Sequence, residues 1–154
     1  MKIRNYEPSD RARLIELHHE LQVVEQVFRP SRAVGVETSE KQLAEYELLL
    51  TEEDASLLVV DDSGTLIGYL MMIAEGELLE EEQGQVYVQD FMVTAAARRK
   101  GVGTLMMSAV REFAALREIS RIDLQVLIGN APAKAFYEAL GFEIAYLGMK
   151  ASVR

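Results

Sequence analysis

A change of pattern in the second half of the chain constrains the fold more than any other feature. Residues 85–93 have the apolar, β-branched and aromatic composition of a strand, and residues 103–116 repeat apolar side chains at helical spacing. Residues 122–128 form a second apolar run of strand length. Two strands of one sheet that are joined through a helix lie parallel and are connected by a right-handed crossover. This stretch therefore predicts a β-α-β unit with a parallel strand pair.

The rest of the chain predicts three more helices and a set of short strands. Pro8 and Thr38 stand at two helix starts, and Gly141 closes a helix over residues 131–140. A turn at residues 61–64 joins two of the strands into an antiparallel hairpin. The expected strands cover residues 3–5, 56–60, 65–74, 85–93, 122–128, 142–146 and 150–153. The predicted fold class is α/β (α+β by some schemes), with a mixed, mostly antiparallel sheet of about seven strands and helices on both faces.

Size and composition indicate one globular domain over residues 1–154. The chain is 49% hydrophobic and 27% charged, which is ordinary for a globular protein. The absence of cysteine excludes disulfides and thiolate sites and fits a cytoplasmic location. We find no signal peptide and no run long enough to span a membrane, so no membrane partner is expected. The net charge of −9 disfavours nucleic acid as a partner and favours a cationic one.

Three cations and two glycines stand where the strand at 85–93 gives way to the helix. Arg98, Arg99 and Lys100 precede Gly101-Val102-Gly103. The first turn of a helix has unpaired N–H groups and a partial positive charge, and glycines let an anion approach that backbone. This loop therefore predicts a phosphate-binding site.

Two familiar phosphate motifs do not fit this loop. A Walker loop requires Gly-Lys-Ser/Thr, and Gly103-Thr104-Leu105 lacks the lysine. A Rossmann fingerprint requires glycine or alanine where Met106 stands, and an acid at the end of the next strand. Asp123 has the right separation but stands at the start of its strand. A third phosphate-binding motif remains to be compared with this loop.

The loop resembles the coenzyme A signature Arg/Gln-x-x-Gly-x-Gly/Ala of the GNAT superfamily of N-acetyltransferases. Residues 91–93 resemble the family's preceding strand, and residues 98–103 resemble the loop itself. Residues 130–142 resemble the family's closing motif, a helix that begins at Asn, carries Phe-Tyr and ends in Gly-Phe. The two motifs stand in the family's order, and the order of elements matches over nearly the whole chain. The resemblance implies a GNAT-like fold with a splayed parallel pair, somewhat like the polyamine and small-amine branch.

The resemblance implies acetyl-CoA as co-substrate, with no metal. In that fold the pantetheine arm inserts between the splayed strands, and a main-chain N–H near Met92 or Val93 polarises the thioester carbonyl. Besides any contact with the coenzyme, Asn130 is expected to cap a helix. Lys134 could equally be an exposed surface lysine with no contact to the coenzyme. The implied coenzyme-binding residues are Phe91, Met92, Val93, Arg98, Arg99, Lys100, Gly101, Val102, Gly103, Thr104, Asn130 and Lys134.

The reaction needs an acid and a base, and the sequence offers a clear candidate only for the acid. Tyr137 matches the family's tyrosine that protonates the departing thiolate. The family's glutamate base is replaced by Gln89, which cannot accept the proton. Asp90 is the alternative catalytic residue, but strand alternation points it to the opposite face from Gln89 unless a β-bulge intervenes. Glu75 and Glu77 are held in reserve, and Asp90 is also readable as a buried structural carboxylate.

Five glutamates between residues 75 and 82 suggest a small cationic amine as acceptor, with Glu75, Glu77 and Gln89 as substrate-binding residues. Two alternatives stay open: a protein N-terminal or lysine acetyltransferase, and a coenzyme A-binding or sensing module without catalysis. A homodimer is expected because many proteins of this fold dimerise. His18 is expected at the edge of the core and His19 at the surface, with no metal site between them.

Overall fold

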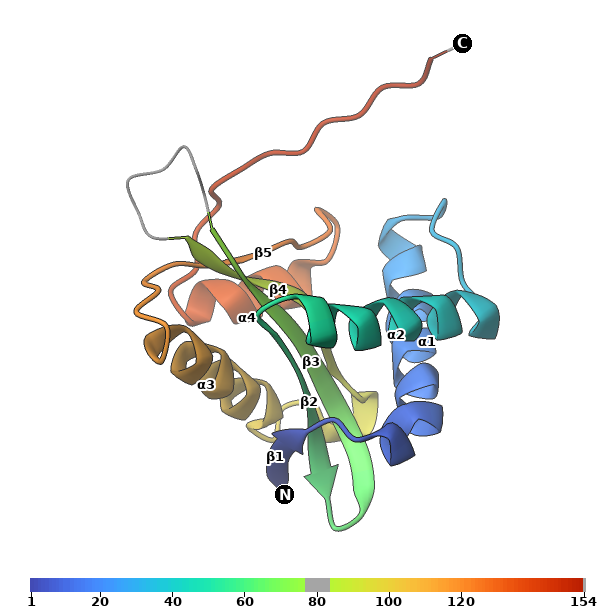
Figure 1. Cartoon of the computed structure of the whole chain (residues 1–154). Coiled ribbons are helices and arrows are strands. Elements are labelled where there is room, and N and C mark those ends of the chain that lie inside the picture. The colour runs from blue at the N-terminus through green and yellow to red at the C-terminus, as the bar shows by residue number, and fades with distance from the viewer. Residues whose placement is uncertain (77–83, 154) are drawn as a thin grey trace.

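The computed structural model describes residues 1–76 and 84–153. Within these ranges five strands form one sheet in the order β1-β2-β3-β4-β5 (Figure 1). All neighbouring strands pair antiparallel except β4 and β5, which are parallel. The strands are β1 Lys2–Asn5, β2 Ala55–Asp62, β3 Thr65–Glu75, β4 Gln85–Val93 and β5 Ile122–Leu124. The predicted mixed fold class is confirmed.

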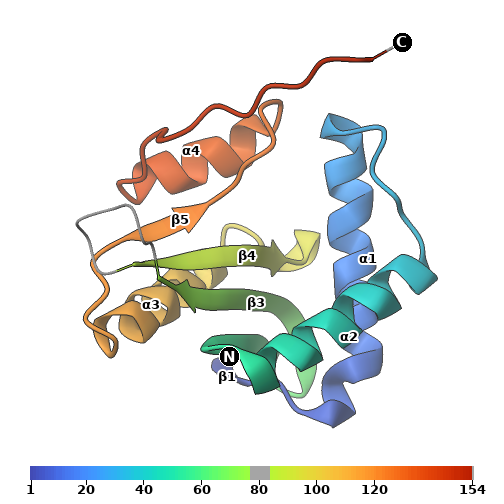
Figure 2. The same ribbon diagram turned by 45° about the horizontal axis from the view of Figure 1, so that its top comes forward.

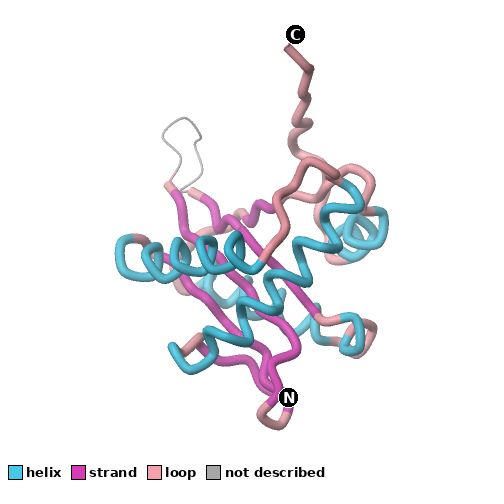
Figure 3. Tube along the Cα trace, turned by 90° about the vertical axis from the view of Figure 1, so that its right-hand side faces the viewer, coloured by secondary structure: helices cyan, strands magenta, loops and turns pink. Residues whose placement is uncertain are grey.

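Four α-helices cover the two faces of the sheet. Helices α1 and α2 cross one face, and α3 lies against the other, with α4 beside β5 (Figures 2 and 3). None of the helices in the described ranges is long and apolar enough to cross a bilayer. Their bounds are α1 Arg11–Phe28, α2 Val36–Glu52, α3 Val102–Ala115 and α4 Ala131–Ala139, with short 3-10 helices at Pro8–Asp10 and Ala95–Ala97.

Each face of the sheet has its own apolar core, because strand side chains alternate between the faces. Leu17 of α1 and Tyr46 of α2 are buried beneath the first pair of helices, together with Tyr69 of β3. Met106 and Val110 of α3 are fully buried on the opposite side. The predicted apolar face of α3 is buried only in part, because Met106 and Phe113 lie in the core whereas Leu116 is 77% exposed.

Strand β4 contains a β-bulge at Gln89. Met71 of β3 pairs with Asp90, but the next residue, Met72, pairs with Val88, so Gln89 has no partner on β3. An extra residue reverses the phase of the side chains that follow it. Val88 therefore packs in the core beneath α3, whereas Asp90 contacts tyrosines on the α1–α2 side.

The parallel pair separates at the same point along β4. The three residues of β5 pair only with Val86–Val88, so within the described chain residues 90–93 of β4 have a strand partner on the β3 side alone and Gln89 has none. The segment after β5 continues toward α1, where a Cβ added at Gly129 would lie 3.2 Å from Phe28 Cδ1. The edge of β4 beyond the bulge is thus open, as the splayed pair of a GNAT fold requires.

The count of about seven strands is wrong, because residues 142–146 and 150–153 form no strand. This segment extends away from the sheet (Figure 1), and Ile144, Leu147 and Met149 are exposed. β5 also ends at Leu124 instead of residue 128. Alternating apolar side chains favour an extended backbone, but a strand also needs a neighbour to share its hydrogen bonds.

Candidate active site

The glycine loop ends in a helix start that no side chain of the described residues caps. α3 begins at Val102 with Gly101 as its N-cap, in the left-handed conformation at φ 81°, and no side chain bonds to the free N–H groups. Gly101 is exposed. Gly103 serves a different purpose: a Cβ there would lie 2.8 Å from the ring of Phe136, so glycine lets α4 approach α3. The first turn of α3 therefore offers unpaired N–H groups to an anion.

Three exposed cations surround this helix start. Arg98 donates from Nε to the Val93 carbonyl oxygen at 3.1 Å, which ties the loop to the end of β4. Within residues 1–76 and 84–153, Arg98, Arg99 and Lys100 form no ion pair with an acidic side chain. In a chain of net charge −9 this is a local positive field beside the helix N-terminus.

Tyr137 projects from α4 into an aromatic cluster beside the open edge of β4. Its ring lies 5.9 Å from that of Phe91, 5.2 Å from Phe136 and 5.6 Å from Phe142. Its hydroxyl has no hydrogen-bond partner among the described residues. Burial, and then the negative charge of Asp90, raise the pKa of Tyr137 above its ordinary value. The phenol therefore keeps its proton at neutral pH and is free to donate it.

Asp90 is held by two tyrosines on the α1–α2 side of β4. The Tyr69 hydroxyl donates to Asp90 Oδ2 at 2.8 Å, and the Tyr46 hydroxyl donates to the same oxygen. Oδ1 has no partner in the part of the chain that the structure describes. Burial raises the pKa of Asp90 to about 6, against the opposing effect of the two hydroxyl donors. The carboxylate thus has one oxygen fixed by two hydrogen bonds and one oxygen without a described partner, in a side chain that is 9% exposed.

A buried polar chain continues from Asp90 through α1. His18 Nε2 lies 3.8 Å from Asp90 Oδ2 and 3.0 Å from Gln22 Nε2, and His18 Nδ1 lies 2.8 Å from Ser39 Oγ. Burial is the main cause that lowers the pKa of His18 to about 4, so its ring is neutral at pH 7. His18 is more deeply buried than the expected core edge. Its ring carries no charge to pair with Asp90.

The two tyrosines that hold Asp90 were not identified as site residues from the sequence. Tyr46 lies in the helix predicted to begin near Thr38, and Tyr69 lies in the strand predicted over residues 65–74, but neither pattern marks a site residue. The spacing of apolar residues shows that a tyrosine ring is buried, but not where its hydroxyl points. A fully buried tyrosine on each of two elements that pack together is a signal for a shared polar partner, because buried hydroxyls are bonded.

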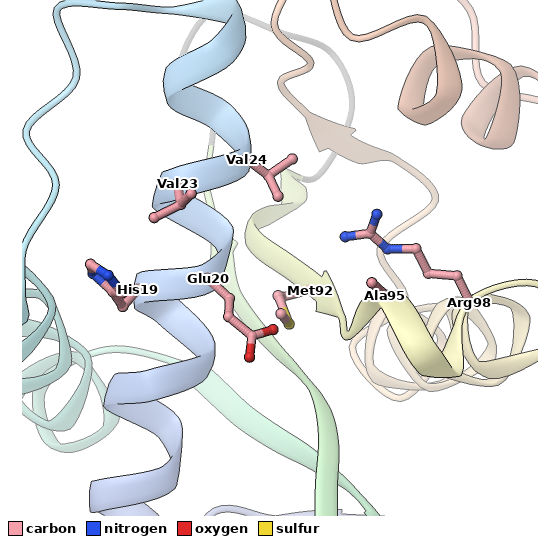
Figure 4. Close-up of a pocket in the computed structure, with 7 residues that line it drawn as sticks. All are labelled: His19, Glu20, Val23, Val24, Met92, Ala95 and Arg98. Atoms are coloured by element: carbon pink, nitrogen blue, oxygen red, sulfur yellow. The ribbon is translucent and has the colours of Figure 1, made fainter.

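A cavity of about 250 Å³ opens between α1 and the end of β4. Figure 4 shows Glu20, Val23 and Val24 on the α1 side, with Met92 and Arg98 on the side of β4 and the glycine loop. The remaining lining residues are His19 and Ala95. His19 is half-buried instead of exposed, and its Nδ1 has no hydrogen-bond partner among the described residues. The cavity meets β4 beyond the bulge, where the strand edge is open.

Not every expected site residue lies near this cavity. Glu75 pairs with Gln85 at the first residue of β4, and Gln85 Nε2 donates to Glu75 Oε2 at 3.1 Å. The glycine loop follows the last residue of β4, eight residues on, which is about 26 Å along an extended strand at 3.3 Å per residue. The structure does not bring Glu75 to the loop, and Glu77, Glu80, Glu81 and Glu82 lie outside the described residues.

The remaining expected residues have local roles. Gln89 is the extra residue of the bulge and is half-buried. Asn130 caps α4, with Oδ1 accepting from the Ala133 N–H at 3.3 Å. Lys134 forms an ion pair with Glu138 on the exposed face of α4. Within the described ranges, no group of three or more histidine or carboxylate side chains could hold a metal ion.

Comparison with known proteins identifies the family. Residues 19–142 match the Acetyltransferase (GNAT) family, which is most of the chain, and the protein belongs to this family. It is an acetyltransferase. Coenzyme A binding follows from this membership together with the open edge of β4 and the uncapped start of α3.

Individual relatives agree with this assignment. The chain is 26% identical, over 93% of its length and 90% of the relative's, to the uncharacterized N-acetyltransferase YhfO of Bacillus subtilis (strain 168). Its fold resembles that of a tetramutant of the BH1408 protein from Bacillus halodurans, at a TM-score of 0.83 and 22% identity over 99% of this chain and 100% of that one. It also resembles AAC(6')-Iy in complex with the bisubstrate analogue CoA-S-monomethyl-acetylneamine, at a TM-score of 0.75 and 16% identity over 99% and 97% of the two chains.

The raised pKa of Asp90 predicts a pH-dependent loss of stability that Asp90→Asn removes. Because the folded protein binds this proton more tightly than the unfolded chain, the contribution of Asp90 to the free energy of unfolding falls as pH rises from about 4 through about 6 and then levels off. Asparagine accepts the same tyrosine hydrogen bonds and carries no charge. We expect the free energy of unfolding of the variant, relative to that of the wild type, to increase by up to about 3 kcal/mol between pH 4 and pH 7.

Urea unfolding at pH 4, 5, 6 and 7 measures this difference. Asp62→Asn, at a position where the carboxylate is half exposed, is the matched control and should follow the wild type at every pH. A constant difference between Asp90→Asn and the wild type across this range would contradict the raised pKa.

Proposed function

We propose that the protein transfers the acetyl group of acetyl-CoA to a primary amine of a small cationic acceptor. The observation that carries the proposal is the open edge of β4 from the bulge at Gln89 to Val93, which the loop of residues 94–101 connects to the uncapped start of α3. A strand edge without a partner can hydrogen-bond an extended amide-containing arm, and a free helix start can bind a diphosphate. Pantetheine followed by a diphosphate is the chemical order of coenzyme A.

The coenzyme-binding residues in this proposal lie on β4, the glycine loop and the first turn of α3. The main chain of Phe91 and Val93 bonds the pantetheine arm, and an N–H near Met92 or Val93 faces the thioester carbonyl. The N–H groups from Gly101 to Thr104, with the charges of Arg98, Arg99 and Lys100, bind the diphosphate. Lys134 is a further phosphate contact, which would require it to leave its ion pair with Glu138.

Tyr137 is the general acid in this proposal. The amine nitrogen forms a bond to the acetyl carbon, the carbon–sulfur bond breaks, and the phenol proton of Tyr137 passes to the departing thiolate. The aromatic cluster around Tyr137 and the lack of a hydrogen-bond partner for its hydroxyl support this role, because the proton is not engaged elsewhere.

Asp90 is the general base that accepts the proton lost by the amine, through a water molecule. Two observations support it: a pKa of about 6, which lies near neutral pH, and an Oδ1 atom that no described side chain occupies. Gln89 cannot take this role, and Glu75 lies at the far end of β4. Asp90 therefore takes the place of the missing glutamate.

A small acceptor is favoured over a protein by the size of the cavity beside β4. Its volume of about 250 Å³ equals roughly eight water molecules at about 30 Å³ each. The net charge of −9 favours a cationic molecule by long-range attraction. A panel of amines and N-terminal peptides in a thiol-release assay with acetyl-CoA distinguishes this acceptor from a protein.

Removing two of the three cations, in Arg99→Ala/Lys100→Ala, should weaken acetyl-CoA binding. We expect a Kd about tenfold higher at low salt, because each charge contributes through water-screened attraction to the diphosphate. The difference should shrink as ionic strength rises. Calorimetric titration at 50 and 300 mM salt measures it, with Lys41→Ala on the exposed face of α2 as control. Equal affinities for the double variant and the wild type would contradict the proposed diphosphate site.

Tyr137→Phe should lower kcat by about 10²-fold or more while leaving the Kd for acetyl-CoA unchanged, because only the acid is lost. The thiol-release assay with the best amine of the panel measures kcat, and calorimetry measures the Kd. Tyr87→Phe, which removes the hydroxyl of a half-buried tyrosine near the start of β4, is the matched control. An unchanged kcat in Tyr137→Phe would exclude the tyrosine as the acid.

A further inference from the structure

The cavity between α1 and β4 has a mainly apolar wall with one carboxylate in it. Val23 and Val24 are 47% and 37% exposed, which is unusual for neighbouring valines on a helix that packs against a sheet. Both line the cavity, and Met92 lines it from the side of β4 (Figure 4). Exposed apolar side chains that face a hollow are suited to a hydrocarbon part of a ligand.

Glu20 supplies the charge on the α1 side of this cavity. Its side chain extends from α1 into the cavity (Figure 4). Within residues 1–76 and 84–153 it forms no ion pair or hydrogen bond with another side chain. By contrast Glu16, one turn earlier on α1, is paired with Arg13 at 2.6 Å. Glu20 is therefore a carboxylate whose position is available to a cation from solution.

The cation that Glu20 binds is not the nitrogen that is acetylated. The attacking nitrogen must lose its proton and reach the open edge of β4, whereas a carboxylate holds an ammonium group in its charged form. Glu20 lies on α1, on the opposite side of the cavity from that edge. A useful ion pair at Glu20 therefore requires a second cationic group on the acceptor, separated from the first by a stretch that contacts the valines.

We propose that Glu20 determines acceptor specificity by binding the distal ammonium of a diamine or polyamine whose hydrocarbon chain lies against Val23, Val24 and Met92. This inference rests on the proposed function, and it assigns the preference of the enzyme for a cationic acceptor to a residue of α1. The acidic segment after β3 has no part in it. Arg98, on the other side of the cavity, repels the distal ammonium and so helps to orient the chain with its charged end toward Glu20.

The test compares two acceptors with the same five-carbon chain that differ by one amino group, 1,5-diaminopentane and pentylamine, in the thiol-release assay. For the wild type we expect kcat/KM to be at least about tenfold higher for the diamine, since one partly desolvated ion pair is lost with the monoamine. In Glu20→Gln the ratio should fall to near one through KM, with kcat unchanged. Glu16→Gln, which removes an already paired carboxylate of the same helix, should keep the wild-type ratio.

The outcomes separate this inference from the proposed function. A Glu20→Gln variant that keeps the wild-type ratio, with an unchanged melting temperature, overturns the assignment of Glu20 even if acetyl transfer to amines is observed. If the wild type releases no thiol with any amine, the proposed function fails, and calorimetric binding of 1,5-diaminopentane decides the inference alone. Weaker binding to Glu20→Gln than to the wild type and Glu16→Gln then supports it, and equal binding to all three overturns it.

Discussion

The rest of the site depends on one irregularity, the bulge at Gln89 in β4. It reverses the side-chain phase of the strand, so that Val88 packs beneath α3 and Asp90 faces the tyrosines on the α1–α2 side. The pairing of β4 with β5 ends one residue before the bulge, at Val88 and Leu124. The bulge at Gln89 thus coincides with two features of β4: the Asp90 carboxylate points to the α1–α2 side, and the strand edge beyond the bulge is open. A regular strand of the same composition would send Asp90 into an apolar core and leave no gap for a ligand.

Charge is distributed to match this geometry. The protein is acidic as a whole, yet Arg98, Arg99 and Lys100 are gathered at the one helix start that adjoins the open edge. The two groups proposed for proton transfer are held on opposite faces of β4, Asp90 among tyrosine hydroxyls and Tyr137 among aromatic rings. Burial raises the pKa of both. For Asp90 this brings the pKa close to neutral pH, whereas for Tyr137 it makes the phenol a weaker acid, so the proposed role of Tyr137 depends on the position of its hydroxyl and not on its pKa.

Much of the fold could be predicted from local patterns, whereas the working details of the site could not. The β-α-β unit and the glycine loop are continuous in the sequence, and hydrophobic periodicity with two short motifs was enough to identify them. The final strands at 142–146 and 150–153 were wrong because periodicity shows that a segment can be extended, not that another strand pairs with it. The tyrosine pair around Asp90 joins α2, β3 and β4, and the cavity at Glu20 joins α1 to β4. Contacts between such distant segments leave no spacing signal in one sequence.

The central claim is that acetyl-CoA lies along the open edge of β4 and ends at the start of α3. Titration of ¹⁵N-labelled protein with acetyl-CoA, followed by amide NMR, tests this most directly, because each main-chain N–H reports its own contact. The account predicts large shifts confined mainly to residues 91–93 and 99–104, with the amides of β1 and β2 nearly unchanged. Saturable shifts that lie elsewhere, with residues 99–104 unaffected, would contradict it.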